Sequence, residues 1–488
     1  MSMIQVENLT FSYPSGHDDI FTDVSFRIDT DWKLGFVGRN GRGKTTFLKL
    51  LLGEYEYSGK IISSVQFDYF PYPVADRSRF TEEVLREVCP LAEEWEYLRE
   101  LSYLDVDEEV LWRPFETLSN GEQTKVLLAA LFLNEGRFLL IDEPTNHLDA
   151  GAREIVSAYL QKKKGFILVS HDRHFLDGCI DHVLSLNRAD IEVQAGNFSS
   201  WMENFAQRQE SEQARKERLQ KDIKRLQKAA KRTAVWSDRV EASKIGSGPV
   251  DRGNIGHKAA KMMKRSKNIE ARRTKAIEQK SGLLKNTETA DELKIASLPY
   301  PGDPLVSFSD VVVRYNGNPV CAPVSFTVHR GRRVLLDGGN GSGKSSLLKI
   351  LAGQPISYSG KVTVGSNLVV SYVPQDTSHL QGTLTEYSKE HGIEEHLFKT
   401  ILRKLDFERT QFEKDIKDFS EGQKKKVLIA GSLCEKAHLY VWDEPLNFID
   451  VYSRMQIEQL IGAFAPAMIL VEHDRAFQET IEAEIVRL

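Results

Sequence analysis

Residues 38–46 read GRNGRGKTT, and residues 338–346 read GGNGSGKSS. Both stretches fit the pattern G-x-x-x-x-G-K-[ST], in which glycines let backbone N–H groups surround phosphates and a lysine reaches the terminal phosphates. Each stretch follows an apolar run, KLGFV or RVLLD, and precedes a segment of helical character. This strand–loop–helix context predicts two phosphate-binding loops, each leading into a helix whose N-terminus favours negative charge.

Three further motifs recur in the same order along the chain. LSNGEQ (118–123) returns as FSEGQK (419–424), FLLIDEPTNHLD (138–149) as LYVWDEPLNFID (439–450), and LVSHD (168–172) as LVEHD (470–474). Ser119 precedes Asp142 by 23 residues, and Ser420 precedes Asp443 by the same 23. Such self-similarity predicts two copies of one domain, at residues 1–201 and 296–488, separated by an unrepeated segment at 202–295.

The apolar runs alternate with helix-length segments, which predicts domains of α/β class with parallel sheets. The stretches from about residue 75 to Ser119, and from Asp376 to Ser420, are predicted to be mostly helical. Each would form a smaller subdomain that carries the LSNGEQ or FSEGQK loop. The predicted fold class is therefore α/β, with two phosphate-loop domains joined by an antiparallel α-helical hairpin.

The composition, 41% hydrophobic and 28% charged residues, is that of an ordinary globular protein. At 488 residues the chain exceeds the size of one hydrophobic core, so two or more domains are expected. No signal peptide is expected, because the start of the sequence has no charged region followed by an apolar run. No membrane domain is expected, because the apolar runs are far shorter than a membrane span. The scattered cysteines suit reduced thiols in a cytosol and are expected to pack as small core residues: Cys89, Cys179, Cys321 and Cys434.

The repeated polar residues fit phosphoryl transfer, which depends on positioning and charge stabilisation. Lys44 and Lys344 can reach the β- and γ-phosphates of ATP. One hydroxyl and one carboxylate in each half are predicted to hold Mg²⁺, namely Thr45 with Asp142 and Ser345 with Asp443. The predicted catalytic residues are the carboxylates that polarise the attacking water and the histidines that contact it or the γ-phosphate: Glu143, Glu444, His171 and His473.

Taken together, these motifs resemble those of ATP-binding cassette ATPases across nearly all of both halves. The resemblance implies that ATP bound at one glycine loop is completed by the signature loop of the opposite half. Lys44 would then face Ser420 and Gly422, and Lys344 would face Ser119 and Gly121. Tyr13 and Tyr315 could stack on adenine, although core packing explains each equally well. The predicted ATP-binding residues are Tyr13, Gly38, Asn40, Gly41, Gly43, Lys44, Thr45, Thr46, Ser119, Gly121, Tyr315, Gly338, Asn340, Gly341, Gly343, Lys344, Ser345, Ser346, Gln375, Ser420 and Gly422.

The two halves depart from the family pattern in different places. Where the family has a Q-loop glutamine, the second half has Gln375 in YVPQ, whereas the first has Tyr72 in YFPY. The second signature, FSEGQ, lacks the first glycine of the usual LSGGQ, and PLNFID replaces PTNHLD. Both glutamates are kept, so hydrolysis at both sites is expected, at unequal rates.

The segment between the halves is strongly basic. Residues 205–285 contain 23 Lys and Arg against 9 Asp and Glu, a net charge of +14, whereas the other 42 basic and 61 acidic residues carry −19. A basic segment in an acidic chain points to a polyanionic partner, although a solvated coiled-coil spacer is the alternative. Two helix-like stretches separated by KIGSGPVDRGNIG predict a helical hairpin. The residues predicted to contact RNA near its tip are Lys244, Arg252, Lys258, Lys261, Met262, Met263, Lys264, Arg265 and Lys267.

Two cassettes with a long basic linker resemble the ABC-F family of ribosome-associated ATPases. GRNGRGKTT, WDEPLNFID and the linker segment AxxxMKRSK are similar to the Lsa/Vga-type antibiotic resistance branch. The resemblance implies a cytoplasmic monomer that uses ATP and Mg²⁺ and binds the 70S ribosome (23S rRNA and P-site tRNA) at the E site. The linker would displace lincosamides, streptogramin A or pleuromutilins from the peptidyl transferase centre. A housekeeping translation factor and the tandem ATPase subunit of a membrane importer remain alternative interpretations.

Overall fold

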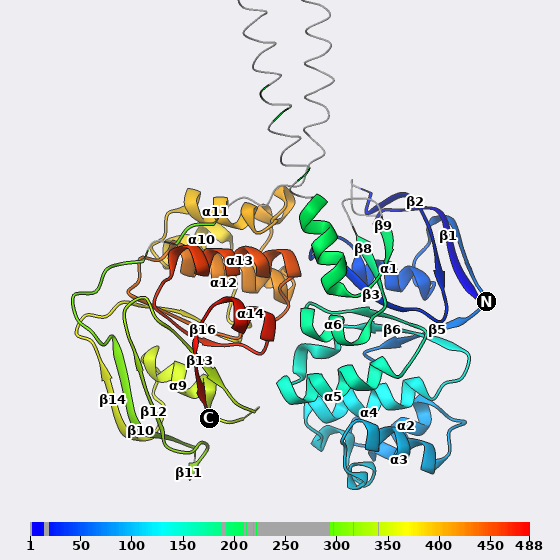
Figure 1. The fold of residues 1–488 in the computed structure, drawn as a ribbon, viewed down its shortest axis with the longest axis horizontal. Helices are drawn as coiled ribbons and strands as arrows, with labels where there is room; N and C mark the ends of the chain where they lie inside the picture. Colours follow the sequence, from blue (N-terminus) through cyan, green and yellow to red (C-terminus); the bar gives the residue numbers. More distant parts are fainter. Residues whose placement is uncertain are drawn as a thin grey trace, which may run out of the picture. The chain divides into compact units, whose positions relative to one another are not determined.

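The computed structural model describes residues 2–13, 19–186, 191–208, 211, 218, 221, 293–295, 297–315, 317–339 and 341–488. The chain divides into two compact units, one made of Met1–Trp201 with Asp291–Leu488 and the other of Met202–Ala290. The first unit holds both repeated halves (Figure 1). The predicted hairpin tip, with Lys244, Arg252, Lys258, Lys261, Met262, Met263, Lys264, Arg265 and Lys267, lies outside the described residues, as does Asn340.

The first half contains a mainly parallel sheet and a smaller antiparallel sheet. The parallel sheet has the order β5-β6-β7-β3-β8-β9, in which only β9 runs antiparallel, and the other sheet has the order β2-β1-β4. The strands are β1 (Met3–Phe11), β2 (Phe21–Asp29), β3 (Lys33–Gly38), β4 (Ser58–Ser63), β5 (Gln66–Phe70), β6 (Arg137–Asp142), β7 (Phe166–Val169), β8 (His182–Leu186) and β9 (Ile191–Ala195). The helices are α1 (Lys44–Leu51), α2 (Thr81–Val88), α3 (Glu94–Tyr103), α4 (Asn120–Phe132), α5 (Ala150–Gln161) and α6 (Arg173–Cys179).

The second half repeats this plan. Its parallel sheet has the order β15-β16-β17-β13-β18, and β10 pairs with β11, β12 and β14 in the antiparallel sheet. The strands are β10 (Val306–Tyr315), β11 (Asn318–Pro319), β12 (Val324–Val328), β13 (Arg333–Asp337), β14 (Tyr358–Val364), β15 (Val370–Val373), β16 (Leu439–Asp443), β17 (Met468–Val471) and β18 (Glu484–Arg487). The helices are α9 (Lys344–Leu351), α10 (Leu384–Glu390), α11 (Glu395–Lys404), α12 (Glu421–Cys434), α13 (Val451–Phe464) and α14 (Arg475–Thr480).

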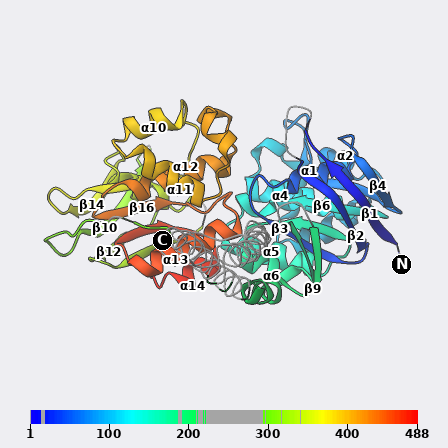
Figure 2. The same ribbon diagram turned by 90° about the horizontal axis from the view of Figure 1, so that it is seen from above.

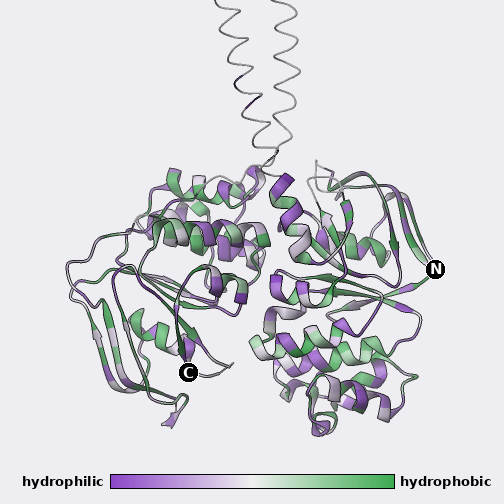
Figure 3. Cartoon of the chain, viewed as in Figure 1, coloured by the Kyte–Doolittle hydropathy of each residue, from purple (hydrophilic) through white to green (hydrophobic). Residues whose placement is uncertain are grey.

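Alternate residues of the parallel strands pack on two different layers. In the second half, Val334 and Leu336 of β13 contact the core that contains α9 and the antiparallel sheet, whereas Leu335 faces the core of α10 to α13. Burial on both faces explains why these strands are continuous apolar runs. Figure 2 shows each antiparallel sheet beside the parallel sheet of its own half, and Figure 3 shows apolar residues on the packed helices. The predicted α/β fold with two phosphate-loop domains is thereby confirmed.

The segments that precede the signature loops are helical, as predicted. Helices α2 and α3 and two short 3-10 helices occupy Thr81–Thr117, and α10 and α11 occupy the matching stretch of the second half. Ser119 caps α4 by accepting a hydrogen bond from the Glu122 N–H, and Ser420 caps α12 in the same way from Gln423. Each serine and its partner form a capping box, which fixes the start of the helix.

Candidate functional site

The two glycine loops have the same backbone conformation. Gly41 and Gly43 have φ of 80° and 101°, and Gly341 and Gly343 have φ of 81° and 91°. A residue with a side chain is strained in this left-handed region of backbone conformation, so glycine is favoured where the loop turns back on itself. The loops connect β3 to α1 and β13 to α9, at the carboxyl ends of central parallel strands, where ligands of α/β sheets bind.

The lysine of each loop is buried against the loop's own carbonyls. Lys44 Nζ donates to Gly38 O at 2.7 Å and to Arg39 O at 3.3 Å, and Lys344 Nζ donates to Gly338 O at 2.7 Å. Burial lowers the pKa of both lysines, because an ammonium loses hydration there. Bound phosphate would supply the negative charge that each buried ammonium needs.

A hydroxyl and a carboxylate meet beside each lysine. Thr45 Oγ1 donates to Asp142 Oδ2 at 2.8 Å, and Ser345 Oγ donates to Asp443 Oδ1 at 3.1 Å. Asp443 Oδ2 is buried and has no hydrogen-bond partner among the described residues. Burial and the neighbouring Glu444 raise the pKa of Asp443 to about 6, although Ser345 opposes this. Oxygen ligands in this arrangement fit Mg²⁺, which takes one or two carboxylates together with substrate phosphates.

The predicted catalytic pairs also come together. Glu143 and Glu444 have φ of 51° and 46°, a left-handed conformation that costs about 1–2 kcal/mol for a residue with a side chain. Glu143 Oε1 lies 3.2 Å from His171 Nε2, and Glu444 Oε1 lies 3.9 Å from His473 Nε2. Burial and Asp142 raise the pKa of Glu143 to about 8, and burial with Lys44 lowers the pKa of His171 well below its usual value.

The Q-loop position distinguishes the two glutamates. Gln375 Nε2 donates to Glu444 Oε2 at 2.7 Å, and Asn447 Nδ2 donates to the same oxygen at 2.5 Å. Tyr72, at the matching position of the first half, instead extends its hydroxyl 3.5 Å from Glu87 Oε1 on α2. The carboxylate of the second half is therefore held by two amides, one of which has no counterpart in the first half.

The two predicted adenine tyrosines reach the helix that follows each glycine loop. Tyr13 Oη lies 2.9 Å from Thr46 Oγ1, and Tyr315 Oη lies 2.9 Å from Ser346 Oγ. The Tyr13 ring packs edge-on against Phe11, whereas Tyr315 is exposed. The exposed ring of Tyr315 therefore has a face available for a base, and stacking by Tyr13 stays a prediction.

A cavity of about 1050 Å³ combines the second glycine loop with the signature loop of the first half. We refer to this region as the second site. The predicted residues that line it are Ser119, Gly121, Tyr315, Gly341, Gly343, Lys344, Ser345, Ser346, Gln375, Glu444 and His473. Lys344 and the Ser119 signature loop thus share one cavity, which is large enough for a nucleoside triphosphate.

The first glycine loop is in direct contact with the second half, and we refer to this region as the first site. Asn40 Nδ2 donates to the Phe448 carbonyl at 2.5 Å. A Cβ placed on Gly422 would lie 2.8 Å from Asn40 Nδ2 and 2.4 Å from Phe448 O, so this signature glycine is packed against the loop. Ser420, two residues earlier, is the N-cap of α12.

Several contributing residues were not predicted from the sequence. Tyr69 Oη donates to Asp142 Oδ2 at 3.0 Å, and Asn447 binds Glu444 as described above. Asn120, Glu122 and Lys125 line the second cavity next to the signature serine. The repeat could have identified Tyr69, since it aligns with Tyr372 in YVPQ; the Tyr372 hydroxyl is buried without a partner among the described residues.

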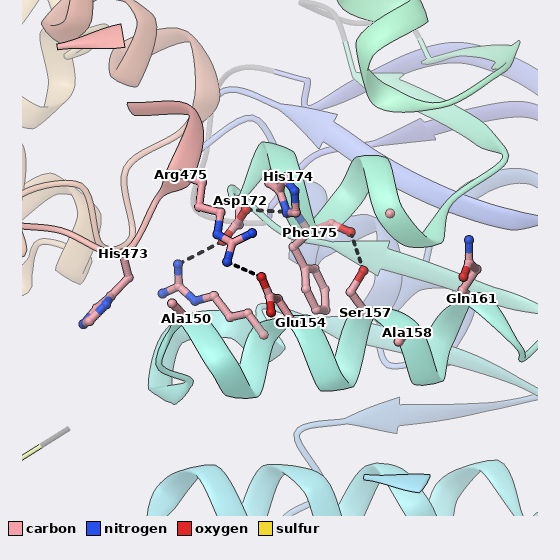
Figure 4. A pocket seen from close by; sticks show the side chains of 12 residues that line it. Ala150, Glu154, Ser157, Ala158, Gln161, Asp172, His174, Phe175, His473 and Arg475 are labelled. Atoms are coloured by element: carbon pink, nitrogen blue, oxygen red, sulfur yellow. Dashed lines mark hydrogen bonds and ion pairs between the residues drawn. The ribbon is translucent and has the colours of Figure 1, made fainter. Parts of the chain in front are cut away.

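Ion pairs across the halves lie close to the two histidine loops. Arg173 of the first half donates to Glu458 of the second through Nη1 and Nη2, and its Nη2 lies 3.8 Å from Asp474 Oδ1. Arg475 of the second half pairs with Glu154 on α5. Figure 4 shows Arg475 beside Glu154 and Asp172 in a cavity of about 300 Å³, with His473 at one side.

Two glycine loops, each with a buried lysine and a hydroxyl–carboxylate pair, define a nucleoside triphosphatase with two sites. A family model described as ABC transporter matches residues 21–146 and 321–447. The chain belongs to this family, and it is an ATPase that binds ATP with Mg²⁺. Lys44 and Lys344 would hold the phosphates, and Thr45 with Asp142 and Ser345 with Asp443 would hold the metal, which neutralises phosphate charge.

Full-length relatives support the ABC-F type within this family. The chain is 27% identical to the ribosome protection protein VmlR of Bacillus subtilis (strain 168), over 98% of this chain and 85% of that protein. It is 26% identical to the energy-dependent translational throttle protein EttA of Haemophilus influenzae (strain ATCC 51907 / DSM 11121 / KW20 / Rd), over 96% and 88%. The fold matches that of the archaeal ribosome recycling factor aABCE1, with a TM-score of 0.63, 18% identity and coverage of 98% and 87%.

A search of the described helices for membrane spans identified no helix with the length and apolar character needed to cross a bilayer.

Proposed function

We propose that this chain is a cytoplasmic, ribosome-associated ATPase of the ABC-F type. It protects the ribosome from antibiotics that act at the peptidyl transferase centre, namely lincosamides, streptogramin A and pleuromutilins. In this proposal the ATP-bound monomer occupies the E site, and the basic segment between the halves reaches toward P-site tRNA and 23S rRNA. Movement of that segment releases the drug.

The cavity of the second site carries this proposal. Its walls come from both halves, so ATP that fills it contacts Lys344 on one side and Ser119 on the other. Binding energy is thereby available to hold the halves together, and hydrolysis removes it. The segment 202–290 is covalently attached to both halves and would respond to this cycle.

The charge distribution supports RNA as the partner of that segment. Residues 205–285 carry +14 in a chain whose total charge is −5. Neutralisation of phosphates by Lys and Arg gives binding that weakens steeply with salt. We infer that Lys261, Lys264, Arg265 and Lys267 bind phosphates, and that Met262 and Met263 contact bases. The similarity to VmlR, a ribosome protection protein, supports the same function.

Sedimentation with ribosomes tests the proposal. The Glu143→Gln, Glu444→Gln double variant should retain ATP and therefore pellet with ribosomes through a sucrose cushion in ATP, but not in ADP. A Lys44→Ala, Lys344→Ala double variant is the matched control, because it lacks the ammonium groups that hold phosphate and should stay in the supernatant. If the glutamine variant remains in the supernatant with ATP, ribosome association is wrong.

Drug susceptibility distinguishes ribosome protection from a housekeeping role in translation. The similarity to the translational throttle protein EttA favours the housekeeping role. Expression of the chain in a susceptible bacterium should raise the inhibitory concentrations of clindamycin, virginiamycin M and tiamulin. The double glutamine variant should not, because it cannot leave the ribosome. Unchanged susceptibility in cells where the wild-type chain pellets with ribosomes would support the housekeeping function.

A further inference from the structure

The helical subdomain of the first half exposes an unusual number of large apolar side chains. Leu91 is 95% exposed, Trp95 54% and Tyr103 50%, and we call these three residues the α3 ridge. Phe80 and Trp112 of the same subdomain are also more than half exposed. Single exposed apolar residues are common, but several in one small subdomain mark an interaction surface.

The repeat provides an internal control for this observation. The matching subdomain of the second half, between Asp376 and Phe419, has the corresponding helices and lies entirely within the described residues. Among its large apolar residues only Leu397 is exposed. The buried positions are alike, since Tyr97 and Leu101 correspond to Phe398 and Leu402. The fold of the subdomain therefore needs the buried residues and does not need the exposed ones.

At the exposed positions the second half has polar residues. With the signature serines aligned, the residues that match Trp95, Tyr103 and Trp112 are His396, Lys404 and Glu413. This difference gives a set of substitutions that the same fold already tolerates.

Trp95 and Tyr103 of the α3 ridge lie on one face of α3, and Leu91 precedes the helix. Trp95, Arg99 and Tyr103 are spaced by four residues, which places them in line on the exposed side of α3. Arg99 lies over the Trp95 ring at 5.1 Å, and Lys162 lies over the Tyr103 ring at 5.4 Å. Both rings therefore already accept a cation on one face.

The surroundings of the ridge are acidic. Residues 76–118 contain 13 Asp and Glu against 5 Lys and Arg, a net charge of −8, whereas residues 376–419 contain 10 against 7, a net charge of −3. Glu93, Glu94 and Glu96 flank Trp95 directly. Such a surface repels nucleic acid phosphates and anionic lipid, and it attracts Lys and Arg side chains.

We propose that the α3 ridge docks a protein surface rich in lysine and arginine, with Trp95 and Tyr103 as its anchoring contacts. Aromatic rings surrounded by carboxylates bind both the stems and the charged ends of such side chains. Figure 1 shows α3 at the outer edge of the first half. This inference rests on the proposed function only in the choice of probe, which is a set of ribosomal proteins.

Photo-crosslinking from the ridge tests this inference. Trp95→benzoylphenylalanine is introduced into the full-length double glutamine variant, and His396→benzoylphenylalanine at the matching position of the second half is the control. Each protein is irradiated with ribosomes in ATP, and separately with RNA-free ribosomal proteins. We expect crosslinks to a basic protein from position 95 in both mixtures, with a yield about tenfold above that from position 396.

Two further variants and the salt response sharpen the result. Tyr103→Lys with Trp112→Glu, the residues of the second half, should reduce the crosslink from position 95 about tenfold without lowering Tm, and high salt should reduce it as well. Crosslinks to RNA or to a second copy of this chain, or equal yields from positions 95 and 396, would overturn the inference. Pelleting reports separately on the proposed function, and the RNA-free mixture tests the ridge even if pelleting fails.

Discussion

The first and second sites are built from the same motifs but differ in packing. At the first site the glycine loop contacts Gly422 and the Phe448 carbonyl of the opposite half, and at the second site the glycine loop and the opposing signature loop line one cavity of about 1050 Å³. The glutamates differ correspondingly. Glu143 lies beside Asp142 and His171 with a pKa raised to about 8, and Glu444 is held by Gln375 and Asn447.

Two arginines in the first loop account for part of this difference. Arg39 and Arg42 lie 3.3 and 3.5 Å from Asp406 of the second half, and Arg39 also lies over the Tyr452 ring at 5.4 Å. The second loop has Gly339 and Ser342 at these positions and can form no such pairs. Arg39 and Arg42 thus give the first glycine loop charged contacts with the opposite half that the second loop does not have.

The largest expected effect comes from the catalytic glutamates. We expect Glu444→Gln to lower the rate of ATP turnover about tenfold or more, because it removes the carboxylate that Gln375 and Asn447 hold in place. On this expectation the second site carries out most of the hydrolysis, so Glu143→Gln should lower turnover by less than about twofold. Phosphate release at saturating ATP measures both. Equal losses would show that the two sites hydrolyse at the same rate.

The chemistry of the sites was predictable from the sequence because it is local. Lys44, Thr45 and Asp142 belong to motifs whose spacing predicts strand, loop and helix, and the same motifs recur in the second half. The difference between the sites was not predictable, because it depends on contacts such as Asn40 with Phe448, which are 408 residues apart in the chain. No pattern within a window of residues reports such packing. The roles assigned to the hairpin residues stay predictions, since they lie outside the described residues.

The ion pairs across the halves should differ in their contribution to stability. Arg173→Gln leaves Glu458 buried without its cation, so we expect a loss of about 3 kcal/mol and a Tm lower by about 6–10 °C. Arg475→Gln is the matched control, because its pair with Glu154 is about half exposed and should contribute under about 1 kcal/mol. Differential scanning calorimetry measures both variants. Similar shifts would mean that burial does not distinguish the pairs.

Acid should reduce the difference between Arg173→Gln and the wild type. Burial alone would raise the pKa of Asp474, but Arg454 and Arg173 outweigh it and hold this pKa below 3.8. A carboxylate whose pKa is lower in the folded than in the unfolded protein stabilises the fold at pH values above its pKa in the unfolded protein. This stabilisation is lost as pH falls through its pKa in the folded protein. Burial raises the pKa of Glu458, although Arg173 opposes this, so the difference in Tm should begin to shrink as pH falls through this raised value and shrink further as Asp474 is protonated. A difference that stays constant down to pH 3 would show that neither carboxylate contributes to the effect of Arg173→Gln.

Exchange of the Q-loop residues should make the ATP turnover of the second site more like that of the first. Gln375→Tyr removes the amide that donates to Glu444, and we expect about a tenfold loss of turnover, which corresponds to one hydrogen bond to a charged group. Tyr72→Gln, the reverse change, should leave turnover within about twofold, because the first site remains packed against Phe448. If Tyr72→Gln raises turnover as much as Gln375→Tyr lowers it, the Q-loop residue and not the packing determines the difference.

The smallest expected effect isolates the contribution of the loop arginines. Asp406→Asn removes the charge that pairs with Arg39 and Arg42, while asparagine tolerates the left-handed backbone at this position, where φ is 69°. The pairs are partly exposed and contribute about 1 kcal/mol, so the first site should open more often and bind a fluorescent ATP analogue about fivefold faster.

Stopped-flow measurements in a Lys344→Ala background report on the first site alone. Asp105→Asn is the matched control, since Asp105 aligns with Asp406 when the signature serines are aligned, also has positive φ, at 51°, and the second glycine loop contains no arginine. High salt should remove the effect of Asp406→Asn by screening the same pairs. An unchanged binding rate would show that the pairs of Arg39 and Arg42 with Asp406 do not limit access to the first site.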